Sequence, residues 1–372
     1  MKARILKNIE WGILICCMAL FIIGCISLYS ATQEANYVEL KRQIIWLLVS
    51  IPIMIAVICI DYSTIAKIAP IFYGIFIILL IAVLFTKPIN GASSWFTIRE
   101  GVQIQPSEFA KIFVIMTFAY LMVIFQKKDK NAINQPLKLL AVLAVVVVPV
   151  LLIIKQPDYG TAIAFMIATI LMLFVAGIDK RYIIGAILIV AVALPLVYFF
   201  VLPDHAKTRI DVFLNPNLDA RGAGYNVIQS KLAIGSGGLI GMGLLKGNQT
   251  QLGFLYPKTT DFIFSVIGEE MGFLVAGAVI VLYVILITKA IYVAKTAKDD
   301  LGSYIAMGIV GIFLFHMIEN IGMTMGLLPI TGVPLPFVSY GGSSLVTNFI
   351  CIGLLLNISG RRQKTIFMDE RL

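Results

Sequence analysis

Long apolar runs dominate this chain, and short polar connections separate them. Most runs have about 17–25 residues, the length at which a helix crosses the hydrocarbon core of a bilayer. The expected helices cover 11–30, 43–60, 64–86, 108–126, 137–155, 160–178, 181–202, 261–288, 303–326 and 337–358. We therefore predict that residues 1–372 form a single all-α polytopic membrane domain with about ten transmembrane helices.

Basic residues gather in alternate connections between these runs. They are Lys2, Arg4 and Lys7 before the first run, Lys127, Lys128 and Lys130 after the fourth, Lys180 and Arg181 after the sixth, Lys289, Lys295 and Lys298 after the eighth, and Arg361, Arg362 and Lys364 after the last. With ten helices, all these residues fall on one side, which the positive-inside rule makes the cytoplasmic side. Both termini are then expected in the cytoplasm.

The connection at about 203–260, before the eighth helix, is long and is expected on the outer, extracytoplasmic face. It holds Lys207, Arg209, Arg221, Lys231, Lys246 and Lys258 against Asp204, Asp211 and Asp219, a net charge of +3. Connections of this length are usually functional or disordered. The apolar, Gly-rich stretch 234–245 argues against disorder, because it can lie in the membrane interface or dip back into the membrane.

Composition excludes a soluble fold. Apolar residues make up 60% of the chain and charged residues 13%, about half the charged share of a soluble domain. The net charge of +9 is explained by cytoplasmic loops, and no basic-aromatic module indicates nucleic acid. The five cysteines lie in apolar runs without a CxxC pair. No Walker A, GxGxxG, HExxH or nucleophile-elbow motif occurs, so nucleotide, zinc and acyl-enzyme chemistry are unsupported.

Two outer connections carry charged residues beside helix starts. Glu108 and Lys111 are i,i+3 on one helix and can pair, either as a structural ion pair or as part of a substrate site. Trp95, in the connection before them, is either an interfacial aromatic or a substrate contact. Asp158 can cap the sixth helix or face the same cavity as Glu108.

The end of the long connection carries Asp261, where the next apolar helix is expected to begin. Asp261 can stabilise the first turn of that helix, but Thr259 or Thr260 can also fill this role. At the wet mouth of a cavity, Asp261 can instead act as a general base. Glu269 and Glu270 lie about 12 Å further along the helix. We expect this pair to bind buried cations or backbone groups.

The last polar segment, 329–344, contains three prolines that prevent a helix. Gly341 and Gly342 allow close backbone approach to a ligand, while Ser339 and Ser343 offer hydroxyl groups. The alternative is tight helix packing through small residues. In the preceding span, His316 and Glu319 are i,i+3 and are expected to form an internal polar clasp.

These groups converge on the outer face beside a basic connection, which predicts an anionic, lipid-linked partner. Two classes fit: an enzyme with Asp261 as base, or a transporter with a polar path. A transporter is expected to carry charges through the membrane depth, often with inverted repeats. The charges cluster outward and no repeat links the two halves of the chain, which favours the enzyme.

Seven segments, in order through the whole chain, resemble the SEDS family (RodA, FtsW and SpoVE). They are Asn-Gly-Ala-Ser-Ser-Trp at 90–95, Gln-Pro-Ser-Glu at 105–108 with Lys111, Gln-Pro-Asp-Tyr-Gly-Thr at 156–161, Ala-Ile-Gly-Ser-Gly-Gly at 233–238, Thr-Asp-Phe-Ile-Phe at 260–264, Gly-Glu-Glu at 268–270, and Pro-Leu-Pro-Phe-Val-Ser-Tyr-Gly-Gly-Ser-Ser at 334–344. The resemblance implies ten transmembrane helices and a peptidoglycan glycosyltransferase. Such an enzyme polymerises lipid II on the outer face of the bacterial cytoplasmic membrane, beside a class B penicillin-binding protein. An older interpretation of the family is a lipid II flippase.

The resemblance also implies roles for individual residues. Asp261 matches the family's essential aspartate and is expected to be the general base. Undecaprenyl pyrophosphate is the expected leaving group of the reaction. The expected substrate-binding residues are Trp95, Glu108, Lys111, Asp158, Arg209, Lys246, Lys258, Ser339, Gly341, Gly342 and Ser343. Arg209 and Lys246 are our own choices for pyrophosphate contacts. A divalent cation (Mg²⁺ or Mn²⁺) is a candidate helper, and no nucleotide or organic cofactor is expected.

Two departures from the family pattern affect the expected pyrophosphate site. Lys258 stands where the family commonly has Glu, and Met242 stands where it often has Lys. A positive charge has therefore moved between these sites. The stretch 247–252 resembles the elongation (RodA) branch more than the division branch, and a sporulation role is a further alternative.

Overall fold

The computed structural model describes residues 8–88, 92–99, 102–200, 204–219 and 222–362. Lys2, Arg4, Lys7, Asn90, Gly91, Arg221 and Lys364, used above, lie outside the described residues. The long apolar helices are α2 (Trp11–Ala31), α3 (Val38–Cys59), α4 (Tyr62–Ala82), α5 (Pro106–Gln126), α6 (Pro136–Ile154), α7 (Tyr159–Val175), α8 (Lys180–Phe200), α12 (Ile263–Lys295), α13 (Asp300–Thr324) and α14 (Gly342–Gly360). The shorter elements are η1 (Gln33–Ala35), η2 (Val83–Phe85), β1 (Phe96–Arg99), β2 (Val102–Ile104), η3 (Lys130–Asn134), α9 (Asp204–Leu214), η4 (Pro216–Asp219), α10 (Ala223–Ser236) and α11 (Asn248–Gln251).

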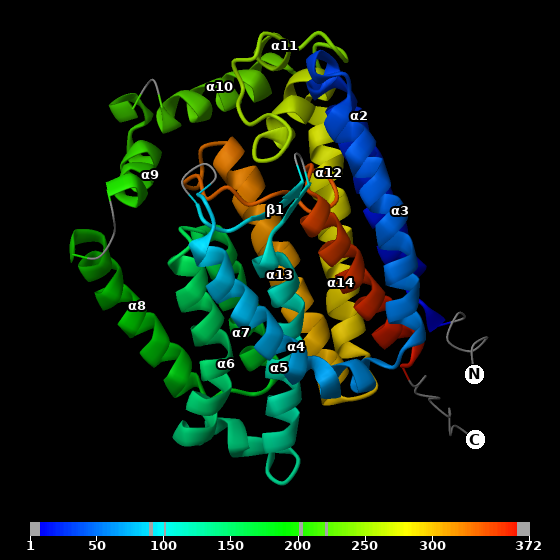
Figure 1. The fold of residues 1–372 in the computed structure, drawn as a ribbon, viewed down its shortest axis with the longest axis vertical. Helices are drawn as coiled ribbons and strands as arrows, with labels where there is room; N and C mark the ends of the chain where they lie inside the picture. Colours follow the sequence, from blue (N-terminus) through cyan, green and yellow to red (C-terminus); the bar gives the residue numbers. More distant parts are fainter. Residues whose placement is uncertain (1–7, 89–91, 100–101, 201–203, 220–221, 363–372) are drawn as a thin grey trace, which may run out of the picture.

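The predicted polytopic all-α architecture is confirmed (Figure 1). Within the described ranges, nine helices are long and apolar enough to cross a membrane, and α7 is a shorter apolar helix of 17 residues. The tenth helix begins at Gly342 rather than at the predicted 337, because the prolines of the preceding segment keep it non-helical.

Several helices begin at residues whose chemistry favours a helix start. Pro106 and Pro136 occupy the first turns of α5 and α6, where a missing N–H costs nothing. Asp61, Asp158 and Asp299 precede α4, α7 and α13, and each carboxylate accepts a backbone N–H of the first turn. The cap role considered for Asp158 is therefore confirmed.

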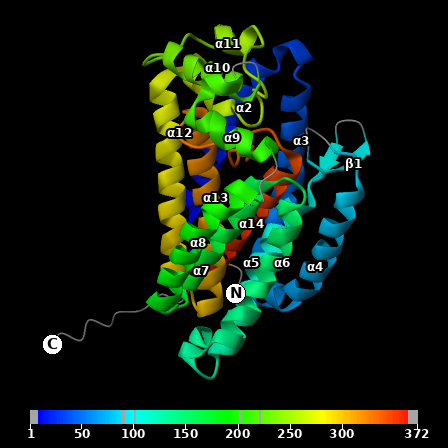
Figure 2. The ribbon, with the colours of Figure 1, turned by 90° about the vertical axis from the view of Figure 1, so that its left-hand side faces the viewer.

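Polar contacts join residues near the two chain termini at one end of the helix bundle. The backbone N–H of Glu10 donates to Ser359 Oγ (3.2 Å), and its carboxylate pairs with Lys289 (2.8 Å). The Tyr62 hydroxyl donates to Asp299 across the same side (2.9 Å). We call this the terminal side. The opposite end, where the chain from α8 to α12 crosses the bundle, is the loop side (Figure 2).

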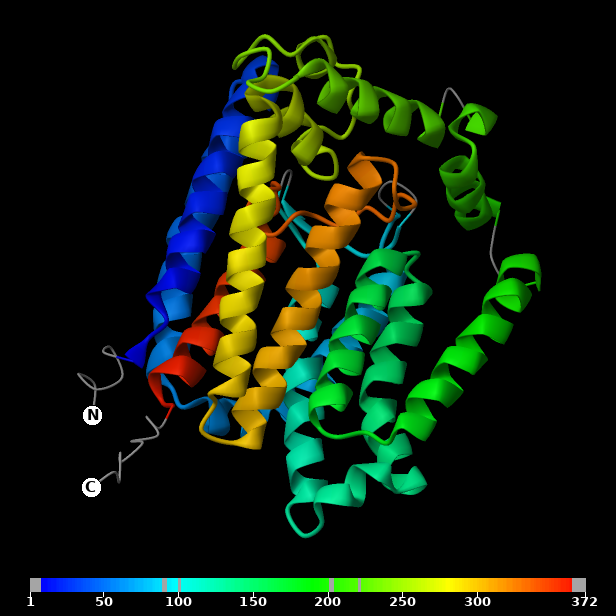
Figure 3. The same ribbon diagram turned by 180° about the vertical axis from the view of Figure 1, so that it is seen from behind.

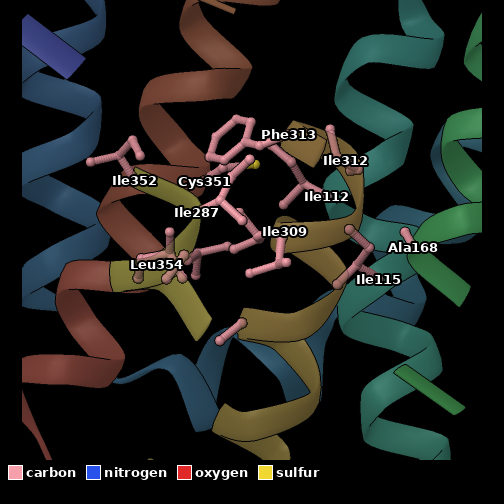
Figure 4. Packing of buried hydrophobic residues seen from close by; sticks show 14 of the residues in the cluster. Ile112, Ile115, Ala168, Ile287, Ile309, Ile312, Phe313, Cys351, Ile352 and Leu354 are labelled. Carbon is pink, nitrogen blue, oxygen red and sulfur yellow. The ribbon is translucent and has the colours of Figure 1, made fainter. Parts of the chain in front are cut away.

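Interior packing relies on apolar side chains and close helix approach. α13 packs against α7 and α12, while α3 packs on α14, α4 on α5 and α2 on α12. Ile112 of α5, Ile287 of α12, Phe313 of α13 and Leu354 of α14 meet in the core (Figure 4). Small residues allow backbones to approach in lipid; a Cβ added at Gly311 would lie 2.5 Å from Ala168 Cα. α8 stands at the periphery, and those of its side chains that the structure describes are exposed or half-buried.

The connection before α12 is largely helical rather than an extended loop. It contains α9, η4, α10 and α11, and α10 packs on α12. After α10, the Gly-rich turn 237–243 docks against a break in α12 instead of lying alone in the interface. Gly272 marks this break, with φ 74° and ψ −175°.

The Gly-rich turn replaces hydrogen bonds that the break removes from α12. Its amide groups donate to two helix carbonyls, and its carbonyl groups accept from two helix amides. The pairs are Met242 N to Glu269 O (2.9 Å), Gly243 N to Glu270 O (3.0 Å), Phe273 N to Gly238 O (2.9 Å) and Leu274 N to Leu239 O (3.1 Å). Unpaired backbone groups are costly near lipid, so this pairing makes the break tolerable.

The break divides α12 into a short segment, 263–271, and a long one, 273–295. At 1.5 Å per residue the long segment alone extends about 35 Å, enough to cross a bilayer. Figure 3 shows the short segment turned away from the axis of the long one. The residues after Asp261 therefore need not run straight into the membrane, as a continuous helix would require.

The expected backbone partners of the Glu269–Glu270 pair are confirmed. The Glu269 carboxylate accepts hydrogen bonds from the N–H groups of Gln249 and Thr250. The Glu270 carboxylate accepts from Gly247 N and Gln251 Nε2. Both carboxylates therefore hold α11 against the end of the short segment, on the loop side rather than in the depth of the bundle.

We predict that Gly272→Ala strongly destabilises the protein. The positive φ disfavours any Cβ, and a Cβ there would lie 2.2 Å from the backbone N of Gly241. Gly277→Ala, on the same helix with nothing within 4 Å, is the matched control. Thermal unfolding of the two purified variants measures the difference; equal unfolding temperatures would contradict the role of the break.

Candidate functional site

Asp261 lies in the connection just before α12, two residues before the helix begins. Three consecutive backbone carbonyls ending at Asp261 each accept a hydrogen bond from α13 or from the connection after it. The pairs are Tyr340 N to Thr259 O (2.9 Å), Ser339 Oγ to Thr260 O (2.6 Å) and Asn320 Nδ2 to Asp261 O (3.0 Å). The segment that carries Asp261 is therefore fixed by its backbone.

The Asp261 carboxyl group is half-buried and has few polar partners. Burial raises its pKa to about 6, while a hydrogen bond from Thr260 and the positive charge of Arg209 on α9 act in the opposite direction. Gly332 is exposed beside it, and a Cβ added there would lie 3.4 Å from Asp261 Oδ2. A carboxyl group with a pKa of about 6 therefore lies next to Gly332, which has no side chain.

A second cluster surrounds Glu108 and Lys111, which pair at 2.8 Å with almost no exposure. Thr347 of α14 donates its hydroxyl to the other Glu108 oxygen (3.1 Å). Lys111 Nζ lies 3.4 Å from His316 Nε2, and His316 Nδ1 lies 3.0 Å from Pro334 O. A carbonyl only accepts, so Nδ1 carries the proton and Nε2 accepts from Lys111. The predicted pairing is confirmed, and it links α5, α13 and α14.

The expected His316–Glu319 clasp is wrong. His316 bonds to Lys111 and Pro334, whereas the Glu319 carboxylate accepts the Thr331 hydroxyl (2.8 Å). The i,i+3 spacing allows such a pair, but donors from other elements take both groups. Glu319 therefore belongs to the α13–α14 connection rather than to the second cluster.

Asp158 combines the two roles that its sequence position left open. Its carboxylate accepts from Thr161 N (3.2 Å) and from Gln105 Nε2 (2.9 Å), immediately before α5. Burial raises its pKa, and the nearby Glu108 charge adds to this shift. Trp95 is half-buried at the start of the β1–β2 hairpin, beside Ser94, whose hydroxyl donates to Gln156 O (3.2 Å).

The predicted Ser and Gly residues of the last connection make hydrogen bonds and close contacts that hold it against other elements. The Ser339 hydroxyl bridges Leu335 N and Thr260 O. Ser343 Oγ accepts from Gln105 N (3.2 Å), and Gly341 N donates to the Gln43 side chain (3.3 Å). Gly342 packs so closely that a Cβ would lie 2.4 Å from the Trp46 ring. The close-packing alternative therefore describes Gly342 well.

Two of the three predicted lysines, Lys246 and Lys258, differ in accessibility. Lys258 donates to Thr250 O (2.8 Å), so its ammonium group is used in fixing α11. Lys246 is exposed just before α11. Of the basic residues chosen from the sequence, Arg209 is the one that acts electrostatically on Asp261.

Several residues of this site were missed from the sequence. Gln43 on α3 is fully buried and donates to Ser339 O (3.1 Å), while Gln105 contacts both Asp158 and Ser343. Thr347 binds Glu108 from α14. A polar side chain inside an apolar run is unusual, and this signal points to Gln43 and Thr347.

The described residues offer no ready-made cluster of acidic, His or Cys side chains for a divalent cation. Among them, no group of three or more His, Cys, Asp or Glu side chains could hold a metal ion. The expected Mg²⁺ or Mn²⁺ stays a prediction without a protein ligand set, and we assign no chemical step to it.

We predict that Glu108→Gln destabilises the protein by about 3 kcal/mol, because it leaves the Lys111 charge buried without an opposite charge. The double variant Glu108→Gln/Lys111→Met should be more stable than this single variant, since no charge remains. Unfolding of the purified proteins tests the order. A double variant that is less stable than Glu108→Gln alone would argue against a structural ion pair.

Comparison with known proteins gives matches along nearly the whole chain. A family model for FtsW, RodA and SpoVE, described as cell cycle protein, matches residues 9–364. Peptidoglycan glycosyltransferase MrdB of Escherichia coli is 36% identical over 359 residues, covering 96% of this chain and 95% of the relative. Peptidoglycan glycosyltransferase RodA of Treponema pallidum is 33% identical (97% and 100%). A probable peptidoglycan glycosyltransferase FtsW of Geobacter metallireducens is 37% identical (97% and 98%).

Solved structures agree with these matches. One from a study of polymerization and crosslinking by a peptidoglycan synthase complex aligns with a TM-score of 0.82 at 26% identity, over 96% of this chain and 99% of that one. The Rod shape determining protein RodA of Thermus thermophilus aligns with a TM-score of 0.71 at 25% identity, over 96% and 98%. With the family model matched from the first helix to the last, this chain belongs to the SEDS family, which includes RodA, FtsW and SpoVE.

Proposed function

We propose that this protein is a peptidoglycan glycosyltransferase that polymerises lipid II at the outer face of a bacterial cytoplasmic membrane. The observation that carries the proposal is the Asp261 carboxyl group, fixed through its backbone on the loop side and subject to the positive charge of Arg209 on α9. The glycosyltransferase names of relatives at 33–37% identity support it.

In the proposed reaction, Asp261 takes the proton of the GlcNAc 4-hydroxyl of the acceptor. The oxygen then attacks the anomeric carbon of the donor MurNAc, and the bond from that carbon to undecaprenyl pyrophosphate breaks. A carboxyl group with a pKa near 6 is largely ionised at neutral pH and still accepts a proton effectively. Arg209 and exposed Lys246 are the proposed contacts for the negative charge on the pyrophosphate.

The second cluster has a supporting role in this scheme. Glu108 and Lys111 are buried with each other, so we assign them to holding α5, α13 and α14 in place. Asp158 and Trp95 lie closer to the loop side and are the proposed sugar contacts. Lys258 and Ser339 act through α11 and the Asp261 segment, respectively.

Orientation follows from charge. Exposed Lys127, Lys128, Lys130, Lys180 and Arg181 lie on the terminal side, which we therefore propose as cytoplasmic. A structurally similar protein works in a peptidoglycan synthase complex, which supports a class B penicillin-binding protein as partner. We propose a role in cell elongation from the 247–252 stretch; RodA-type and FtsW-type relatives have similar identities, so division is the alternative.

We predict that Asp261→Asn abolishes strand formation from lipid II by the purified protein with its partner, because the base is lost. Asp179→Asn, which changes a carboxylate of the terminal side, is the control and should remain active. The assay is run in detergent, where there is no membrane to flip across. Full strand yield from Asp261→Asn would exclude the base assignment. No strands from the unaltered protein, with lipid scrambling in vesicles, would favour the transporter.

The polymerisation rate should rise with pH through about 6, as Asp261 loses its proton. Arg209 lowers the pKa of this carboxyl, so Arg209→Gln should move the acid limb of the profile to higher pH. Initial rates measured against pH test both statements. An acid limb that stays in place or moves to lower pH in Arg209→Gln would contradict the electrostatic effect assigned to Arg209.

A further inference from the structure

Asn320 of α13 joins two connections with one side-chain amide group. The residue is fully buried, and its Nδ2 donates to Asp261 O (3.0 Å) and to Val333 O (2.8 Å). Asp261 precedes α12, whereas Val333 belongs to the connection between α13 and α14. Val333 is the neighbour of Gly332, which faces the Asp261 carboxyl group. Asn320 thus binds the backbone of Asp261 and that of the residue next to Gly332.

We propose that Asn320 is a positioning residue that sets the separation between Asp261 and Gly332. This inference rests on the proposed role of Asp261 as base. A primary amide offers two N–H donors on one nitrogen, and both carbonyls use Nδ2. A hydroxyl or an apolar side chain leaves at least one carbonyl unsatisfied, which loosens one connection from the other.

Asn320 differs from the other two anchors of this segment. Tyr340 N and Ser339 Oγ hold Thr259 and Thr260, and they come from the far end of the α13–α14 connection. Asn320 holds the peptide group of Asp261 itself. Its loss therefore changes where the carboxyl group points and how much water reaches it, while the other anchors keep the segment in place.

The charged groups around Asp261 stay the same when Asn320 is replaced by a neutral residue. The charge that acts on Asp261 is that of Arg209 on α9. Further titratable groups on its own and neighbouring elements are Lys231 on α10, Lys258, Glu319 on α13 and Tyr340. Lys258 and Glu319 are bound to Thr250 and Thr331. A change in the pH profile of a neutral variant therefore reports the hydration and placement of Asp261.

The chain contains a matched control for this test. Asn357 of α14 is also fully buried, and its Nδ2 donates to two backbone carbonyls, those of Val57 and Ile60. It also accepts from Arg361. These contacts lie on the terminal side, so Asn357→Leu removes an equivalent double anchor far from the site.

The experiment compares full-length Asn320→Leu, Asn357→Leu and the unaltered protein, each purified with its partner. It records strand formation against lipid II concentration and pH, and thermal unfolding. In Asn320→Leu, kcat should fall about 10- to 100-fold with KM changed by less than about twofold. Its acid limb should move below pH 6, because added water lowers the pKa of Asp261. Asn357→Leu should lower the unfolding temperature, with kcat and the acid limb unchanged.

Asn320→Gln, which keeps both donors on a longer side chain, is the variant to use if Asn320→Leu does not accumulate. It should move the acid limb in the same direction, with a smaller loss of kcat. Equal losses of kcat in the Asn320 and Asn357 variants, with the acid limb in place, would reduce Asn320 to a structural residue and overturn the inference. If the unaltered protein is active and Asn320→Leu changes neither kcat nor the acid limb, only this inference is overturned. An unaltered protein that forms no strands overturns the proposed function and this inference together.

Discussion

The structure depends on the need to pair backbone hydrogen-bonding groups wherever the chain leaves a helix near lipid. Water cannot satisfy such groups there, so each interruption requires donors and acceptors from elsewhere in the protein. At Gly272 the interruption is paired by the turn after α10. At Asp261 it is paired by α13 and by the connection that follows it. The non-helical segments of the loop side are consequently held in specific positions.

The α13–α14 connection links the two polar clusters of the protein. Pro334 O binds His316, which contacts Lys111 and thereby the buried ion pair. Val333 O shares Asn320 with the Asp261 backbone. A shift of this connection would therefore act on both clusters together. Buried charges in an apolar bundle are expensive, and Glu108 and Lys111 are held by groups from α5, α13 and α14.

The number and type of helices could be predicted from the sequence, because the bilayer sets one length for every span and this length shows directly in the apolar runs. The Glu108–Lys111 pair and the Asp158 cap could also be predicted, since i,i+3 and N-cap contacts are local. The His316–Glu319 clasp shows the limit of this reasoning. Its spacing is equally favourable, but Lys111 and Thr331 compete for the two side chains.

By itself, the sequence determined the membrane architecture, the family and the residue types of the site, because hydropathy, charge asymmetry and short motifs are written along the chain. Only the tertiary structure decided which groups meet. Lys258 turned out to fix α11, Gly342 to pack on Trp46, and Asn320 to hold Asp261. These contacts join residues from distant elements, and their choice depends on the competition among all buried donors and acceptors for partners in a bundle that excludes water.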